Sequence, residues 1–195
     1  MPQANRLKNL EIRNCVKTLQ KGETLLYPTD TIWGLGCDAT CRDAVSRIYR
    51  LKNREEDKSF IILADSVEMM KAYVEEVPPA AYDLLEAMSD TPLTIIYPKG
   101  RGLADNVPGA DGSVAIRIVQ GKFCSEVIAK FGKPIVSTSA NISGFPAPLK
   151  LADIAEPVLA GVDHIAIVNE QSFGDVRPSR IIKLEENGMF RVIRE

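Results

Sequence analysis

The chain has 195 residues, 45% of them hydrophobic, which is enough for one domain with a substantial core over residues 1–195. Its 24 lysines and arginines face 26 aspartates and glutamates, so a net charge of −2 excludes a surface that attracts nucleic acid as a whole. No stretch approaches the roughly 20 apolar residues of a membrane span, and the N-terminus lacks the apolar run of a signal peptide. We therefore expect a cytoplasmic protein.

Helical and strand-like segments alternate along the chain. Apolar residues at helical spacing, namely Ile12, Cys15 and Leu19, predict a first helix. The hydroxyl-rich segment after the first strand is interpreted as a turn, and Thr40 with Asp43 resembles a capping box for a helix that ends near Leu51. The other expected helices are Val67–Val74 capped by Ser66, one from Pro78 to about Met88, Lys122–Phe131 and Leu151–Leu159. The expected strands are Thr24–Tyr27, Ser59–Leu63, Leu93–Tyr97, Val114–Val119, Ile135–Ser137 and His164–Val168.

The chain closes with a predicted hairpin. Strands Arg180–Leu184 and Phe190–Arg194 flank a turn in which Asn187 and Gly188 supply positive φ angles. Antiparallel pairs of this kind, added to strands joined by crossover helices, predict an α/β fold built on a twisted mixed β-sheet flanked by helices.

The number of histidines and the absence of two nucleotide-binding motifs exclude several kinds of catalytic site. The single histidine, His164, starts an apolar run with no sign of a nucleophile beside it, so histidine-based nucleophilic catalysis is not expected. Neither a Walker A loop nor a G-x-G-x-x-G fingerprint is present. Cys37 and Cys41 could share a zinc ion with His164, but the spacing is not that of a structural zinc site, and we expect no metal site.

Three cations follow the second predicted helix within seven residues. Lys52, Arg54 and Lys58 could converge on a phosphate group, and phosphoryl or nucleotidyl transfer asks mainly for such positioning and charge. The alternative is a solvated helix end whose cations answer the acidic residues 55–57, since exposed ion pairs contribute only ~0–1 kcal/mol.

A second candidate is the polar segment at the end of the strand Ile135–Ser137. Five of the seven residues 137–143 carry a hydroxyl or amide side chain, and ligands in α/β sheets gather outside the carboxyl ends of strands. Local side-chain to backbone bonds in a turn are the alternative explanation. Arg117 stands in a strand that otherwise reads as core, so its guanidinium needs an anion, either a structural carboxylate or a substrate carboxylate.

Five motifs occur together in the order seen in YrdC-like proteins, and the chain resembles that family from about Leu10 to its C-terminus. They are the Tyr27–Gly36 segment YPTDTIWGLG, Lys52-x-Arg54, Val114-Ala-Ile-Arg117, Ser137-Thr-Ser-Ala-Asn141-x-Ser-Gly144 and Pro178-Ser179. The resemblance implies a concave cleft and a threonylcarbamoyl-AMP synthase reaction, in which L-threonine, bicarbonate or CO2 and ATP give threonylcarbamoyl-AMP and pyrophosphate. The product would pass to a tRNA threonylcarbamoyl transferase complex.

The resemblance also implies roles for individual residues. Lys52 and Arg54 would be catalytic. The residues expected to bind ATP, which would carry Mg²⁺, are Lys52, Arg54, Lys58, Ser139, Asn141 and Arg194. Those expected to bind threonine are Thr31, Arg117, Ser139 and Ser179. Trp33 is the apolar residue that we expect to line the cleft. Glu55 stands where the family has proline, which places a negative charge beside the phosphate-binding cations.

Two other functions remain open from the sequence. One is an RNA-binding module without synthase activity; the net charge and the 6% aromatic content argue against more than a weak tRNA contact. The other is a divergent YrdC relative that has lost the activity, although the chain keeps both Lys52-x-Arg54 and Ser139-x-Asn141.

Overall fold

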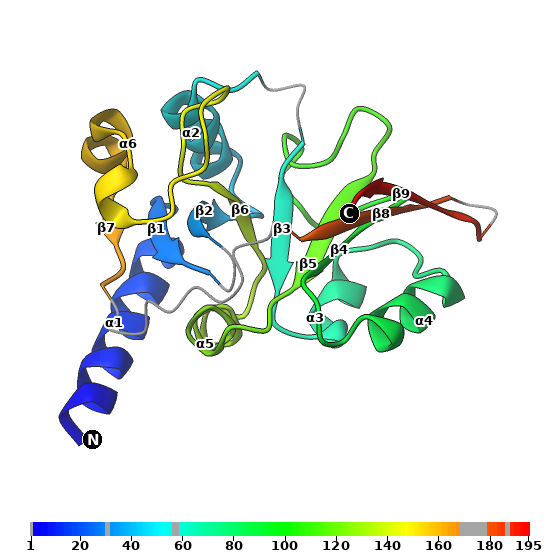
Figure 1. The fold of residues 1–195 in the computed structure, drawn as a ribbon, viewed down its shortest axis with the longest axis horizontal. Helices are drawn as coiled ribbons and strands as arrows, with labels where there is room; N and C mark the ends of the chain where they lie inside the picture. The colour runs from blue at the N-terminus through cyan, green and yellow to red at the C-terminus, as the bar shows by residue number, and fades with distance from the viewer. Residues whose placement is uncertain (1, 30–31, 56–58, 168–178, 186–187) are drawn as a thin grey trace.

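Nine strands form one twisted sheet at the centre of the structure, a computed structural model that describes residues 2–29, 32–55, 59–167, 179–185 and 188–195. The strand order is β7-β1-β2-β6-β3-β5-β4-β8-β9 (Figure 1). Parallel pairs, such as β3 with β5, stand beside antiparallel pairs, such as β2 with β6, so the predicted mixed sheet is confirmed. The strands are β1 Leu25–Pro28, β2 Trp33–Asp38, β3 Ile61–Ala64, β4 Leu93–Tyr97, β5 Val114–Ile118, β6 Ile135–Ser139, β7 His164–Ile165, β8 Arg180–Leu184 and β9 Phe190–Arg194.

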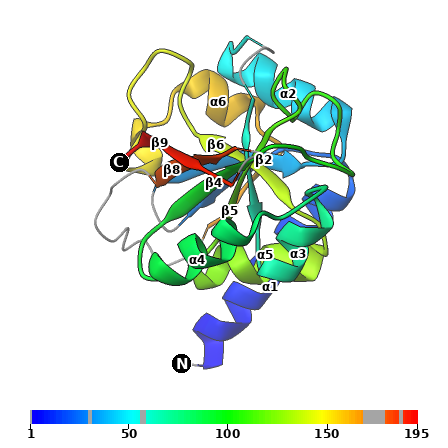
Figure 2. The same cartoon turned by 90° about the vertical axis from the view of Figure 1, so that its right-hand side faces the viewer.

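Helices cover both faces of the sheet (Figure 2). Successive side chains of β1 point to opposite faces of the sheet. Leu25 and Tyr27 belong to the core cluster with α1 and α5, whereas Leu26 belongs to the cluster with α2 and α6. None of the helices in the described part of the chain is long and apolar enough to span a bilayer. The helices are α1 Pro2–Gln20, α2 Arg42–Lys52, α3 Val67–Ala72, α4 Pro79–Ala87, α5 Lys122–Phe131 and α6 Glu156–Gly161, with a 3₁₀ turn at Leu151–Asp153.

Several predicted elements have the predicted bounds, namely β4, β8, β9 and α5. Ser66 caps α3 as expected, because its hydroxyl accepts a hydrogen bond from the Met69 amide at 3.2 Å. The clearest error is β2, which is missing from the predicted strands because its residues were assigned to a turn. Gly34 and Gly36 suggest a turn, yet β2 is buried along its whole length between β1 and β6.

Two smaller predictions also differ. The capping box at Thr40 is wrong: Thr40 donates its hydroxyl to Asp38 Oδ1 at 2.7 Å, and Cys41 stands at the N-cap of α2 without a side-chain hydrogen bond. The Asp38 carboxylate, at the end of β2, is a charged acceptor for this hydroxyl. The strand predicted over His164–Val168 ends at Ile165, and Val168 lies outside the described residues, as does Asn187 of the predicted hairpin turn.

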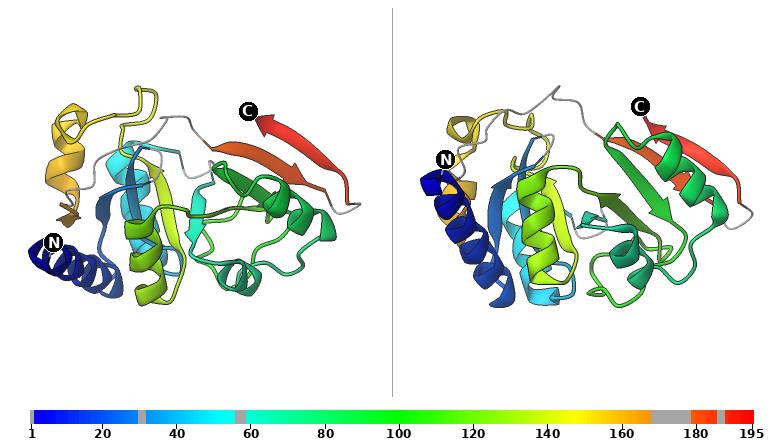
Figure 3. Two further views of the ribbon diagram at one scale, coloured as in Figure 1. Left: turned by 60° about the horizontal axis from the view of Figure 1, so that its bottom comes forward. Right: turned by 90° about the horizontal axis from the view of Figure 1, so that it is seen from below.

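One face of the sheet changes character from apolar to polar across neighbouring strands. Ser137 is paired with Ile61, and Leu63 with Arg117, so these four side chains point to the same face as the α1 and α5 core. The helices α1 and α5 pack near β1, β2 and β3 at one side of this face, seen from below in Figure 3. The register therefore places polar and charged side chains on the sheet beyond these helices.

We expect Gly36→Ala to lower the free energy of unfolding by about 3 kcal/mol or more. A Cβ atom at Gly36 would overlap the backbone carbonyl oxygen of Val136 and lie 3.1 Å from the Tyr27 ring, and a paired backbone cannot move aside. Gly132→Ala is the control: its φ of 76° is unfavourable for alanine, but no atom lies within 4 Å, so about 1–2 kcal/mol is expected. Urea unfolding of both variants tests this, and equal losses would contradict it.

Candidate active site

A cavity of about 340 Å³ opens where β6 ends, against β3 and β5. Its lining combines arginine side chains, hydroxyl groups and apolar residues from the strands. The lining residues are Thr29, Ile32, Gly34, Arg54, Ser59, Phe60, Ile61, Leu63, Arg117, Ser137, Thr138, Ser139, Ala147, Ser179 and Arg194.

The described lining of the cavity carries positive charge. Arg54, Arg117 and Arg194 line it, and no aspartate or glutamate is among the described lining residues. Arg117 is only 6% exposed, as predicted from its place in an apolar strand. Burial, together with the charge of Arg117, lowers the pKa of Arg194 from its ordinary value. Two guanidinium groups held close together, that of Arg117 buried, favour an anion such as a carboxylate.

Arg54 is positioned by the end of α2. Asn53 adopts a left-handed conformation with a φ of 48°, and the Arg54 amide then donates to the Tyr49 carbonyl at 3.0 Å. The Arg54 guanidinium donates to the Ser59 carbonyl at 3.0 Å and lies 5.1 Å from the centroid of the Phe60 ring. Arg54 is therefore held at the cavity rather than extended into solvent.

Ser179 and Arg194 form the opposite wall through a hydrogen-bonded group. Arg194 donates from Nε and Nη2 to the Ser179 carbonyl, at 3.1 Å and 2.7 Å. The Ser179 hydroxyl lies 2.8 Å from the hydroxyl of Thr94, which is fully buried on β4 directly beside Arg117. Thr94 was not among the predicted site residues, although a hydroxyl inside the apolar run Leu93–Tyr97 is a signal that could have identified it.

Lys52 lies behind this cavity, not in it. Its side chain is 2% exposed, and Nζ donates to the backbone carbonyls of Ser139 and Asn141 at 2.5 Å and 2.6 Å. The Lys52 carbonyl in turn accepts from the Ser143 amide at 2.8 Å. Asn141 completes the connection, because its side-chain amide donates to the Phe145 carbonyl at 2.7 Å. Lys52 is thus a clamp on the segment that follows β6, and the solvated helix-end interpretation is wrong for this residue.

Tyr27 reaches the cavity floor from β1 across two glycines. Its hydroxyl donates to Ser137 Oγ at 2.8 Å, and a Cβ at Gly34 or Gly36 would lie 3.1 to 3.2 Å from its ring. Burial raises the pKa of Tyr27 well above its ordinary value, so the phenol keeps its proton and acts as the donor. The Ser137 hydroxyl is then left to donate into the cavity.

The structure brings most predicted site residues together. Arg54, Ser139, Arg117, Ser179 and Arg194 line the cavity, whereas Lys52 and Asn141 support its wall. Thr31 and Lys58 lie outside the described residues. Arg194, predicted to contact nucleotide, lies beside the residues predicted to hold threonine. Thr29 and Ser137 line the cavity without having been assigned a ligand.

A second cavity, of about 450 Å³, adjoins the first and shares Ala147 with it. Its walls are largely apolar and include Ile142, Phe145, Pro148 and Leu149. Trp33 lines neither cavity: it is 1% exposed in the core with α2, so the prediction that it lines the cleft is wrong. Because side chains alternate along β2, Trp33 faces away from Gly34 and the cavity.

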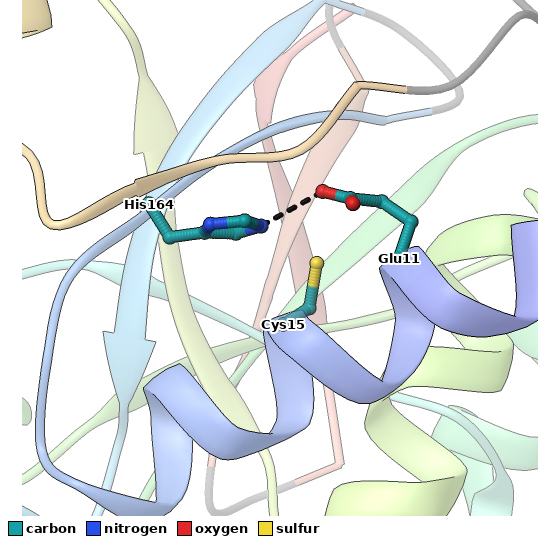
Figure 4. Close-up of side chains that lie close together, drawn as sticks. All are labelled: Glu11, Cys15 and His164. Carbon is teal, nitrogen blue, oxygen red and sulfur yellow. Dashed lines mark hydrogen bonds and ion pairs between the residues drawn. The ribbon is translucent and has the colours of Figure 1, made fainter. Parts of the chain in front are cut away.

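His164 has a partner that the sequence did not reveal. Its Nε2 lies 2.7 Å from Glu11 Oε1 on α1, with Cys15 one helical turn farther along (Figure 4). Among the described residues, Cys37 and Cys41 do not gather with His164. The zinc arrangement considered from the sequence is therefore not formed.

Comparison with known proteins identifies the family. A model named Sua5/YciO/YrdC and described as telomere recombination matches residues 17–195. The chain belongs to the Sua5/YciO/YrdC family. A threonylcarbamoyl-AMP synthase of Hahella chejuensis is 37% identical over 153 residues, which cover 78% of this chain and 83% of that protein.

Solved members of the Sua5/YciO/YrdC family share the fold. The crystal structure of P. abyssi Sua5 complexed with L-threonine is 30% identical with a TM-score of 0.79, and the match covers 89% of this chain but 50% of that one. Escherichia coli YciO, at 22% identity, has a TM-score of 0.80, and the match covers 96% of this chain and 89% of that one. The predicted YrdC-like fold is confirmed.

We expect Lys52 to make the stability of this family member depend on pH in a particular direction. Burial, and then the charge of Arg54, lower the pKa of Lys52 from 10.5 to about 8. Between these pH values the unfolded chain binds the proton that the folded chain has released, so this group makes the free energy of unfolding rise with pH. The difference in that free energy between the wild type and Lys52→Met should therefore grow as the pH is raised from about 8 to about 10.

Chemical unfolding of both proteins across this pH range measures the difference. The exposed lysine Lys71 on α3 provides the control, because Lys71→Met should leave the pH profile of the wild type unchanged. A constant difference between wild type and Lys52→Met would contradict the assignment.

Proposed function

We propose that the chain is an L-threonylcarbamoyladenylate synthase that makes threonylcarbamoyl-AMP and pyrophosphate from L-threonine, bicarbonate or CO2, and ATP. The observation that carries the proposal is the cavity in which Arg194 and the buried Arg117 converge with the Ser179 hydroxyl. The relatives named threonylcarbamoyl-AMP synthase and the threonine complex of P. abyssi Sua5 support it.

Threonine would bind at the wall formed by β5, β9 and Ser179. The carboxylate would lie against Arg117, gripped through two parallel N–H donors, with Arg194 as the second positive group. Thr94 fixes the Ser179 hydroxyl, and Thr31 would complete this side of the site. Ser137 offers an additional donor at the floor, where a carboxyl group derived from CO2 can be placed near the amine.

ATP would span both cavities. Its phosphates would face Arg54, Lys58 and Ser139, and its adenine would lie in the apolar cavity beside Phe145 and Pro148. The segment Ser139–Asn141 separates the two cavities, and the Lys52 clamp would hold it at a fixed distance from both substrates. Mg²⁺ would arrive with the triphosphate and keep several waters, since no carboxylate is among the described residues that line the first cavity.

The chemistry needs no protein nucleophile. The threonine amine attacks CO2, forms a C–N bond and releases a proton, which gives a carbamate. A carbamate oxygen then attacks the α-phosphorus, the bond from that phosphorus to the β-phosphate bridging oxygen breaks, and pyrophosphate leaves. Arg54 and Lys58 would stabilise the charge that develops on the leaving group. The Lys52 ammonium would act through the position of Ser139 and Asn141, not by touching the phosphates.

The product would be consumed in the cytoplasm by a tRNA threonylcarbamoyl transferase complex. The alternative, an RNA-binding module without this activity, is not favoured. Its basic residues would need to present an open charged surface, whereas Arg117 is buried and Arg194 is bonded to Ser179.

The reaction is tested by following pyrophosphate release from ATP. We expect release only when threonine and bicarbonate are both present, because the carbamate is the group that attacks the α-phosphorus. Release that continues without either one would refute the proposed reaction, and salt-dependent tRNA binding without release would favour the RNA-binding alternative.

The division of the cavity is tested by two arginine variants. Arg117→Ala should raise the KM for threonine about tenfold to a hundredfold and change that for ATP little, because a charge-assisted hydrogen bond is worth ~1.5–3 kcal/mol. Arg54→Ala should have the reverse effect. Steady-state kinetics with each substrate varied in turn gives both values. The exposed Arg191→Ala on β9 is the control and should change neither; equal effects of Arg117→Ala on both substrates would contradict the division.

A further inference from the structure

Three side chains meet where α1 crosses β7, away from both cavities. Glu11 and Cys15 stand one turn apart on α1, and His164 comes from β7 (Figure 4). Each residue offers one ligand atom, and these three atoms lie within 4.8 Å of one another. They are a carboxylate oxygen, the thiol sulfur and an imidazole nitrogen. None of the three residues lines the cavities described above.

These donors form a set that suits one class of metal ion. Thiolate sulfur and imidazole nitrogen are borderline to soft ligands that bind Zn²⁺ and related transition-metal ions, whereas Mg²⁺ and Ca²⁺ take oxygen ligands. Zinc bonds of about 2.0–2.3 Å require the ligand atoms to lie roughly 3 to 4 Å apart. The observed spacing reaches this range with small side-chain movements, because Glu11 is long and the helix spacing already places Cys15 below the His164 to Glu11 hydrogen bond.

The carboxylate is already oriented by its neighbours. Glu11 Oε1 accepts from the Ile167 amide at 3.2 Å, and Oε2 accepts from Asn14 Nδ2 at 3.4 Å. Such outer hydrogen bonds fix the direction of a ligating group. Cys15 is fully buried, whereas the side chains of Glu11 and His164 are 15% and 26% exposed, so an ion can enter from the solvent side.

We propose that Glu11, Cys15 and His164 form a binding site for a Zn²⁺-class transition-metal ion, with one coordination position left for water. On binding, the metal forms a bond to Cys15 Sγ and the thiol proton is released to solvent. Burial and the adjacent Glu11 carboxylate raise the pKa of Cys15 to about 12, so the thiol is protonated before the ion binds. His164 Nε2 and Glu11 Oε1 exchange their mutual hydrogen bond for bonds to the same ion.

The site has a structural consequence. It would connect α1 to β7, an edge strand of two residues, and so bind the folded chain in preference to the unfolded chain. The bound ion should therefore raise the melting temperature without entering the catalytic cavity. This makes the site independent of the proposed reaction.

Titration of the full chain with Co²⁺ and Zn²⁺ tests the proposal. We expect Co²⁺ to produce a thiolate-to-metal charge-transfer band that Zn²⁺ displaces, and Zn²⁺ to raise the melting temperature. Cys15→Ala should abolish the band and weaken Zn²⁺ binding by about a hundredfold or more. Glu11→Gln and His164→Gln, which keep the size of the side chains, should weaken Zn²⁺ binding by at least about tenfold, since even outer-shell changes cost ~10–100-fold.

Cys37→Ala is the matched control, because Cys37 is an equally buried cysteine in the other core cluster. It should leave the Co²⁺ band and the Zn²⁺ affinity unchanged. Absence of a thiolate band in the wild type, or a band that persists in Cys15→Ala, overturns the proposal. If Cys15→Ala does not fold, unchanged Zn²⁺ affinity in both Glu11→Gln and His164→Gln overturns it equally.

Discussion

The site depends on one buried ammonium group. Lys52 Nζ donates to the backbone carbonyls of Ser139, the last residue of β6, and of Asn141, two residues beyond the end of that strand. A buried carbonyl without a donor costs about 1–3 kcal/mol, and the Lys52 ammonium supplies the donor for these two carbonyls. The segment can therefore leave the sheet, pass between two cavities and still have a fixed position.

The remainder of the cavity follows from the register of the sheet. Neighbouring strands place Thr94, Arg117 and Leu63 in one row, and alternation sends all three side chains to the same face. The polar end of this row lies at the cavity, and its apolar end continues into the core under α5. The cavity lining and the packing surface are thus two parts of one face, which explains why a buried arginine occurs in a strand that otherwise resembles core.

Much of this arrangement can be predicted from the sequence, for identifiable reasons. Arg117 is conspicuous because a guanidinium in an apolar strand demands an anion, and α5 has clear periodicity bounded by Gly121 and Gly132. The strand β2 could not be predicted in the same way, since its glycines are required by the Tyr27 ring that packs across them, a contact made only in the folded sheet. The position of Lys52 depends likewise on carbonyl groups nearly ninety residues away. The partner of His164 is hidden for the same reason, as it comes from the first helix.

The place of Arg194 in the sheet has a consequence for folding. The cavity takes residues from Thr29 to Arg194, and the wall built by Arg194 requires β9 on β8, β8 on β4 and β4 on β5. The pairing of β8 with β4 joins residues almost ninety positions apart, and closing so long a loop carries a large entropic cost. A chain that has folded only its β1, β2 and β6 half would lack the wall of the cavity to which Arg194 belongs. Substrate affinity in this protein therefore requires the complete sheet. A bound ligand would stabilise molecules with the complete sheet relative to partly folded ones.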